Sequence, residues 1–161
     1  MPRPIIGLAL ALLGLATISA AAQPASPARD TGAMERAVVS RINEIRRVQG
    51  RPPLRVDATL SRVAREYACW LSTRQTLTHE GPAGQTVADR VRTAGQPFRE
   101  VGENLASNVN VPDPVATAID GWMTSEGHRD NVLRGAFTRT GVGICRRGRA
   151  YYFTQVFLRP A

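Results

Sequence analysis

Five polar side chains in this sequence have types and spacing that could do chemistry. The chain has two histidines, His79 in LTHEG and His128 in SEGHRD. Glu103 stands between apolar residues in VGENLA, and Ser125 and Glu126 closely precede His128. A carboxylate in an apolar stretch needs a partner, because an unpaired buried charge is strongly unfavourable. The pattern predicts that these residues, distant along the chain, meet in one site.

Two kinds of chemistry fit this set. Ser125 and His128 are three residues apart and share a face if a helix continues through them, which would suit a nucleophile and its general base. The sequence has no G-x-S-x-G turn and no identifiable third orienting group, so this pattern is weak. The two histidines with Glu103 could instead hold a divalent metal, although their spacing is unlike H-E-x-x-H.

Structural roles would also account for some of these residues singly. His79 lies in a loop, and loops carry ordinary polar residues as well as functional ones. Glu103 could accept hydrogen bonds from a backbone turn. The sequence leaves these interpretations open beside the functional ones.

Apolar periodicity predicts two long helices before His79. In residues 31–48, apolar residues recur at i, i+4 and i+7, and Asp30 or Thr31 serves as the N-cap. A second helix begins with Asp57 as its N-cap and carries the strongest helical stripe in the chain. That stripe consists of Leu60, Val63, Ala64, Tyr67, Ala68 and Leu71. The loop LTHEGPAG follows and carries His79.

The second half of the chain predicts a short helix, a strand, a further helix and a hairpin. QTVADRVRTAG is typical of a helix that Gly95 ends, and FREVGENLASN of an extended segment. Asp113 and Pro114 open another helix, which Gly127 ends or kinks. The segments TGVGIC and AYYFTQVFL flank the glycine-bearing turn RRGR and form a hairpin.

The last predicted strand indicates the layering of the fold. It has large apolar side chains on both alternating faces, Tyr151, Phe153 and Phe157 on one and Tyr152, Val156 and Leu158 on the other. A strand that is apolar on both faces is covered on both faces. Helices on each side of a small, mainly antiparallel sheet give an α+β fold, a three-layer α-β-α sandwich.

The N-terminus predicts export. Residues 1–22 combine a basic start, a short apolar run and an A-x-A site ending at Ala22, which is typical of a signal peptide. A non-cleaved anchor is the alternative. Residues 23–30 are predicted to be a disordered lead, which leaves residues 31–161 as one domain. After cleavage near Ala22 we expect a secreted or periplasmic protein without stable membrane insertion, because no later apolar run is long enough to span a bilayer.

The two cysteines, Cys69 and Cys145, are consistent with export to an oxidising compartment. An even number of cysteines in an exported domain predicts one disulfide between them. Two unrelated buried thiols are the alternative, since spacing alone cannot prove pairing.

The charge of the chain is strongly basic. The formal net charge is +8, and all 21 basic residues counted as Lys and Arg are Arg. They are scattered, without the basic and aromatic pattern of a nucleic-acid module, so we expect no nucleic-acid partner. A bias towards Arg codons explains the absence of Lys, and weak adhesion to anionic envelope polymers stays open. We expect a monomer.

Five ordered segments resemble the bacterial branch of the CAP superfamily. These are the cysteine-rich secretory, antigen-five and plant pathogenesis-related proteins, also called SCP domains. The segments are HEG from His79, GENLA from Gly102, WMTSEGHRDNVL from Trp122, GVG from Gly141 and YYFTQVF from Tyr151. The resemblance covers about residues 31–158. It implies an α-β-α sandwich with a central cavity lined by two histidines and acidic residues.

Carried over residue by residue, the resemblance places His79, Glu103 and His128 in that cavity, with Ser125 and Glu126 beside them. In animal and plant members a second acidic residue stands three residues after the Trp. Here that position holds Ser125, a departure that weakens family-like metal binding or proteolysis. Zinc is the cofactor that fits His79, His128 and Glu103, with water as a fourth ligand.

The sequence therefore predicts an exported binding module rather than an enzyme. Its His- and Glu-lined cavity would take a small ligand, lipid or peptide. One alternative is a protease-like or esterase-like hydrolase that uses Ser125, His128 and Glu103. A second alternative is an envelope adhesion protein that binds through its Arg-rich surface.

Overall fold

A computed structural model describes residues 30–161 of the chain. The predicted signal peptide, and the predicted lead up to residue 29, lie outside the described residues. The helical elements are α1 (Thr31–Val48), α2 (Ala58–Arg74), the short 3-10 turn η1 (Pro82–Gly84), α3 (Val87–Thr93), α4 (Pro114–Thr124) and α5 (Glu126–Leu133). The strands are β1 (Arg55–Val56), β2 (Phe98–Val109), β3 (Arg139–Arg147) and β4 (Ala150–Pro160).

The strands form one sheet in the order β1-β3-β4-β2. Strand β4 pairs antiparallel with β3 on one side and with β2 on the other, and only the two-residue β1 runs parallel to its neighbour β3. The expected hairpin and the small, mainly antiparallel sheet are confirmed. The sequence does not predict β1, because two residues after a proline pair carry no readable alternation.

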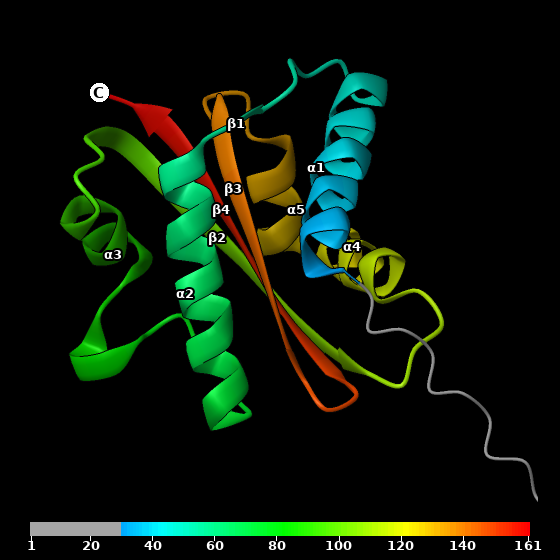
Figure 1. Cartoon of the computed structure of the whole chain (residues 1–161). Coiled ribbons are helices and arrows are strands. Elements are labelled where there is room, and N and C mark those ends of the chain that lie inside the picture. Colours follow the sequence, from blue (N-terminus) through cyan, green and yellow to red (C-terminus); the bar gives the residue numbers. More distant parts are fainter. Residues whose placement is uncertain (1–29) are drawn as a thin grey trace, which may run out of the picture.

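Helices cover both faces of this sheet, as Figure 1 shows for α2 against α1 and α4. On one face, Phe153 and Phe157 of β4 belong to a core that also contains residues of α1, α4 and α5. On the other face, Val156 and Leu158 pack with residues of α2 and α3. Both alternating sets of the last strand are thus buried, and the predicted three-layer α-β-α sandwich is confirmed.

Side chains cap the N-termini of several helices, and the caps of α1, α2 and α4 are ones that the sequence predicts. Asp30, Asp57 and Asp113 each accept a hydrogen bond from a backbone N–H in the first turn of α1, α2 and α4. Thr86 and Asp89 form a capping box at the start of α3. These caps satisfy backbone donors that a helix leaves unpaired at its N-terminus.

The chain bends at Ser125, where a single continuing helix was one expectation. Ser125 is extended, with φ −92° and ψ 122°, and separates α4 from α5. Gly127 lies inside α5 and neither ends nor kinks the preceding helix. The end of α4 is held on β2, because the Trp122 indole donates a hydrogen bond of 2.9 Å to the Leu105 carbonyl. Ser125 and His128 therefore do not share one helical face.

The GVG segment lets α2 lie directly on β3. A Cβ atom added at Gly143 would stand 2.1 Å from the backbone nitrogen of Arg65, and one at Gly141 would stand 2.2 Å from the carbonyl carbon of Leu60. Real Cβ atoms do not approach backbone so closely. The two glycines are therefore required by the packing of α2, while Val142 between them belongs to the opposite core.

Replacing Gly143 by alanine is expected to lower the free energy of unfolding by roughly 3 kcal/mol, because α2 must move away from the sheet. Urea unfolding followed by circular dichroism measures this change. Gly121→Ala is the matched control: its Cβ meets no atom within 4 Å in α4, so a gain of about 0.5–1 kcal/mol is expected. Equal stability of Gly143→Ala and wild type would contradict the close packing.

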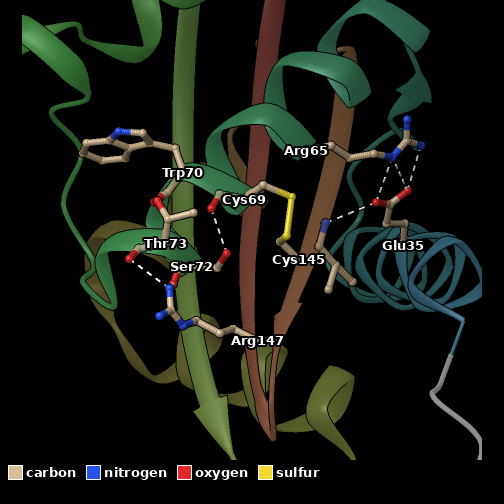
Figure 2. The surroundings of a disulfide bond; sticks show 9 residues. Glu35, Arg65, Cys69, Trp70, Ser72, Thr73, Cys145 and Arg147 are labelled. Atoms are coloured by element: carbon tan, nitrogen blue, oxygen red, sulfur yellow. Dashed lines mark hydrogen bonds and ion pairs between the residues drawn. A yellow bond between two sulfur atoms is a disulfide. The ribbon is translucent and has the colours of Figure 1, made fainter.

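A disulfide joins α2 to the same strand. Cys69 and Cys145 are bonded, with their Cα atoms 4.9 Å apart, as Figure 2 shows. Arg147 of β3 adds hydrogen bonds of 3.3 and 3.0 Å to the carbonyls of Ser72 and Thr73 in the last turn of α2. The predicted pairing is present, and it anchors the helical turn that precedes the His79 loop.

Candidate functional site

Glu103 is a carboxylate inside the fold. It lies in β2 opposite Val156 of β4 and faces the layer that contains α2 and α3. Its side chain is 1 % exposed, and its Oε1 lies 2.9 Å from Nδ1 of His79. Because a carboxylate only accepts, the His79 nitrogen carries the proton of this hydrogen bond. The structure therefore brings His79 and Glu103 into contact, as the sequence suggested.

The second oxygen of Glu103 is bound by Arg90, which the sequence motifs did not place in the site. The Arg90 guanidinium, from α3, lies 2.5 Å from Glu103 Oε2, and its side chain is 10 % exposed. It also donates a 2.9 Å hydrogen bond to the Gln85 carbonyl and stacks 3.4 Å over the Tyr67 ring. The need of the buried Glu103 carboxylate for a cationic partner was the sequence signal that could have pointed to Arg90. The sequence motifs suggested a histidine as that partner instead.

Tyr67 connects α2 to the loop that carries His79. Its hydroxyl donates a short hydrogen bond to the carbonyl of Thr78, the residue before His79. Burial is the main cause that raises the pKa of the Tyr67 phenol, so the group stays protonated and remains a donor. The loop position of His79 is thus fixed by a buried residue of the strongest helical stripe.

His128 belongs to the helical layer on the other face of the sheet from His79. It lies in the first turn of α5, and its backbone carbonyl accepts a 2.9 Å hydrogen bond from the Asn104 side chain on β2. Asn131 of α5 donates to the Asn104 side chain and to the Glu103 carbonyl. Strand β2 is an edge strand of the sheet, and it is contacted by α5 through Asn104 on one face and by His79 through Glu103 on the other.

The surroundings of His128 disfavour its charged form. The pKa of His128 is lowered, chiefly by its burial and secondly by the positive charge of a protonated His79. Because the folded-state pKa lies below the ordinary value of 6.5, protonation favours the unfolded chain. This contribution therefore weakens the fold as the pH falls from about 6.5 towards the folded-state pKa of His128.

A titration of histidine ring protons by NMR is expected to give a midpoint below 6.5 for His128. His79→Gln leaves a single histidine resonance, which assigns the signal. It should also raise the His128 midpoint only part of the way, since the larger cause, burial, remains. A midpoint that does not move in His79→Gln would show that the two side chains do not interact.

Ser125 and Glu126 lie at the junction of α4 and α5. Ser125 is half-buried and Glu126 is exposed. In the part of the chain that the structure describes, Ser125 makes no side-chain hydrogen bond to cap α5 and none to His128. The arrangement does not supply the nucleophile and base contact that the hydrolase hypothesis requires.

The donor set does not fit a divalent metal. Glu103 already gives one oxygen to His79 and the other to the guanidinium of Arg90. A metal ion would have to displace that cation from a nearly buried contact. Within residues 30–161 no three His, Cys, Asp or Glu side chains converge as a metal-binding group. The zinc hypothesis for His79, His128 and Glu103 gains no support here.

A groove of about 270 Å³ opens next to this network, between α2 and the η1–α3 segment. Arg90 and Tyr67 belong both to the Glu103 network and to the groove wall. Its other lining residues are Arg62, Val63, Glu66, Trp70, Pro82, Gln85, Thr93 and Ala94. None of the five residues expected from the sequence lines it. No sequence pattern pointed to this groove, because its walls come from separate helices.

Comparison with known proteins identifies the family. The sequence profile of the cysteine-rich secretory protein family, named CAP, matches residues 39–157. An uncharacterized protein of Bacillus subtilis (strain 168), YkwD, is 36% identical over 126 residues, which are 78% of this chain and 47% of YkwD. The uncharacterized membrane protein YlbC of the same organism is 30% identical, over 78% of this chain and 34% of YlbC. The chain thus spans less than half the length of these two relatives.

Solved structures agree with this match. An extracellular protein containing a SCP domain from Bacillus anthracis str. Ames has a TM-score of 0.74 at 28% identity, covering 86% of this chain and 45% of that one. An outer surface protein from Borrelia burgdorferi has a TM-score of 0.75 at 26% identity, covering 82% of this chain and 96% of that one. By its sequence profile and its fold, the chain belongs to the cysteine-rich secretory protein family, CAP.

Proposed function

We propose that this CAP domain is an exported binding module rather than an enzyme. The observation that carries the proposal is the state of Glu103, whose two oxygens are taken by His79 and Arg90. A carboxylate held in this way is poorly placed to accept a proton from a substrate or to bind a metal. The network instead makes a rigid wall for the adjoining groove, and rigid, partly apolar grooves suit ligand binding.

Export is supported by the N-terminal sequence and by the relatives. The structural neighbours include a protein described as extracellular and another described as an outer surface protein. Among residues 30–161, no helix has the length and apolar character needed to cross a bilayer. We propose a secreted or periplasmic location, with cleavage of the signal peptide near Ala22.

The binding function is tested on protein purified from its own exported compartment under native conditions. Native mass spectrometry and solvent extraction are expected to find a bound molecule on wild type and less of it on Arg90→Ala. Arg92→Ala is the matched control, because Arg92 lies on the same helix, is 64 % exposed and does not line the groove.

A repeatedly empty protein that also takes up no ligand from a panel of lipids, peptides and saccharides would contradict the binding function. Hydrolysis of a peptide or ester substrate that Ser125→Ala abolishes would establish the hydrolase alternative in its place.

A further inference from the structure

We propose that the groove between α2 and α3 binds a neutral saccharide, with the Trp70 ring as its stacking surface. The proposal rests on the binding function given above and names the class of ligand. It is carried by the aromatic rings of the groove, by the pairing of its charged residues and by the neutral polar groups that remain without partners.

The groove has an aromatic wall. The rings of Tyr67 and Trp70 are stacked, with centroids 5.5 Å apart and an angle of 10° between their planes. Tyr67 is buried, whereas Trp70 is only half-buried and lines the groove. The guanidinium of the exposed Arg74 lies 5.9 Å from the centroid of the Trp70 ring, so a ligand that stacks on this ring has to displace a solvent-exposed side chain. Aromatic rings offer a flat apolar surface at a low entropic cost, and the C–H face of a pyranose ring is flat and apolar as well.

The turn that carries Trp70 is held in place from the other side. Figure 2 shows the Trp70 ring and the Cys69 side chain leaving α2 in opposite directions. Cys69 is covalently tied to Cys145 of β3. Trp70 is therefore presented by a helix turn that is anchored to the sheet, which reduces the ordering that a ligand has to impose.

Charged side chains in the groove are already paired. Arg90 is bound to Glu103 at 2.5 Å, and Arg62 lies 3.0 Å from Glu66 one helical turn away. Arg62, Glu66 and Arg90 are the charged residues that line the groove. At these three residues a formally charged ligand would have to compete with an ion pair already made, which favours a neutral ligand.

Three neutral polar groups lining the groove have no such partner. Within residues 30–161, no hydrogen bond involves the Gln85 amide, the Trp70 indole N–H or the Thr93 hydroxyl. The Gln85 backbone is fixed, since its carbonyl accepts from Gly81 N–H and from Arg90. An amide, an indole and a hydroxyl together supply donors and acceptors for a ligand that carries several hydroxyls.

The combination of an aromatic ring with three unpaired polar groups favours a saccharide over a lipid as the ligand. An acyl chain lying on Trp70 would cover the three polar groups without giving them hydrogen bonds, and each lost bond to water is unfavourable. A saccharide offers an apolar face to the ring and hydroxyls to the amide, indole and Thr93 at the same time. A groove of about 270 Å³ fits a small ligand or one short stretch of a longer glycan.

Tryptophan fluorescence tests this directly, because the chain has two tryptophans. Trp122 is 1% exposed, so quenching by iodide reports mainly on Trp70. Tetrasaccharides of N-acetylglucosamine and of glucose are the probes. At least one is expected to protect Trp70 from iodide in a saturable way, with binding that calorimetry confirms and that salt leaves unchanged, since no charge is involved.

Variants locate the site. Trp70→Ala is expected to weaken binding at least about tenfold, and Gln85→Ala about three- to tenfold, from the loss of one stacking surface and one hydrogen-bonding group. Gln49→Ala, an exposed glutamine at the end of α1, is the matched control and should bind as wild type. Circular dichroism shows whether Trp70→Ala folds. If it does not, the comparison of saccharide binding by Gln85→Ala and by Gln49→Ala tests the site.

Three results would overturn the saccharide assignment. The first is no protection by either tetrasaccharide. The second is equal binding by Gln85→Ala and wild type. The third is displacement of the probe by a fatty acid or a proline-rich peptide that binds more tightly at Trp70. In the third case, or if lipid co-purifies with the protein, the binding function stands and only the ligand class is wrong. If nothing binds, both proposals fail.

Discussion

Replacing Arg90 by alanine is expected to lower the free energy of unfolding by about 3–5 kcal/mol, measured by urea unfolding. The cause is Glu103, whose side chain is 1 % exposed and whose Oε2 receives the guanidinium at 2.5 Å. Removing one member of a buried ion pair leaves an uncompensated charge in the interior, and that is strongly destabilising. His79 cannot take over this role, because it bonds the other oxygen and its side chain is 59 % exposed.

Two further variants separate the buried charge from other effects. Arg92→Ala removes an exposed arginine from the same helix and should change stability by less than about 1 kcal/mol. The double variant Arg90→Ala with Glu103→Gln removes the charge as well, and most of the loss should be recovered. A loss in Arg90→Ala no larger than in Arg92→Ala would show that Glu103 does not depend on this partner.

Removal of the disulfide should lower stability by a comparable amount. Cys69 and Cys145 are 76 residues apart in sequence, so the bond closes a long loop in the unfolded chain. In the chain-entropy account this constraint is worth about 4 kcal/mol. The double variant Cys69→Ser with Cys145→Ser is expected to lose that much free energy of unfolding. The urea m-value should rise, because the unfolded chain then exposes more surface.

Arg147→Ala is the control for contacts made only in the folded state at the same place. It removes hydrogen bonds to the carbonyls of Ser72 and Thr73 but leaves the covalent loop intact. A loss of about 1 kcal/mol without a change of m-value is expected. Two free thiols in protein that was unfolded without reduction would disprove the disulfide itself.

Arg90 and the disulfide both contribute to the structure of the groove. Arg90 forms part of its wall, and the disulfide holds the turn that presents Trp70. Arg90→Ala and the disulfide variant should therefore weaken saccharide binding even under conditions in which both remain folded. Arg92→Ala and Arg147→Ala, which keep the wall and the anchor, should bind as wild type.

Local patterns in the sequence determined the elements of the fold. The helical stripe from Leu60 to Leu71, with its cap at Asp57, predicted α2 because periodicity and capping act over a few neighbouring residues. The two apolar faces of residues 151–158 predicted the three layers, since a strand buried on both sides needs cover on both sides. The same local logic marked Glu103 as a buried carboxylate in need of a partner.

Only the tertiary structure decided which partners these residues have. Glu103 is met by Arg90 of α3 as well as by His79, because a buried carboxylate accepts whichever cation the packing of α3 on β2 brings to it. The bend at Ser125 comes three residues after Trp122, which is held on β2 by a hydrogen bond between distant parts of the chain. The groove beside Trp70 exists because α3 is packed at a distance from α2 that no periodicity encodes. Sequence patterns report on the neighbours of a residue along one element, whereas a site is made by the spacing between elements.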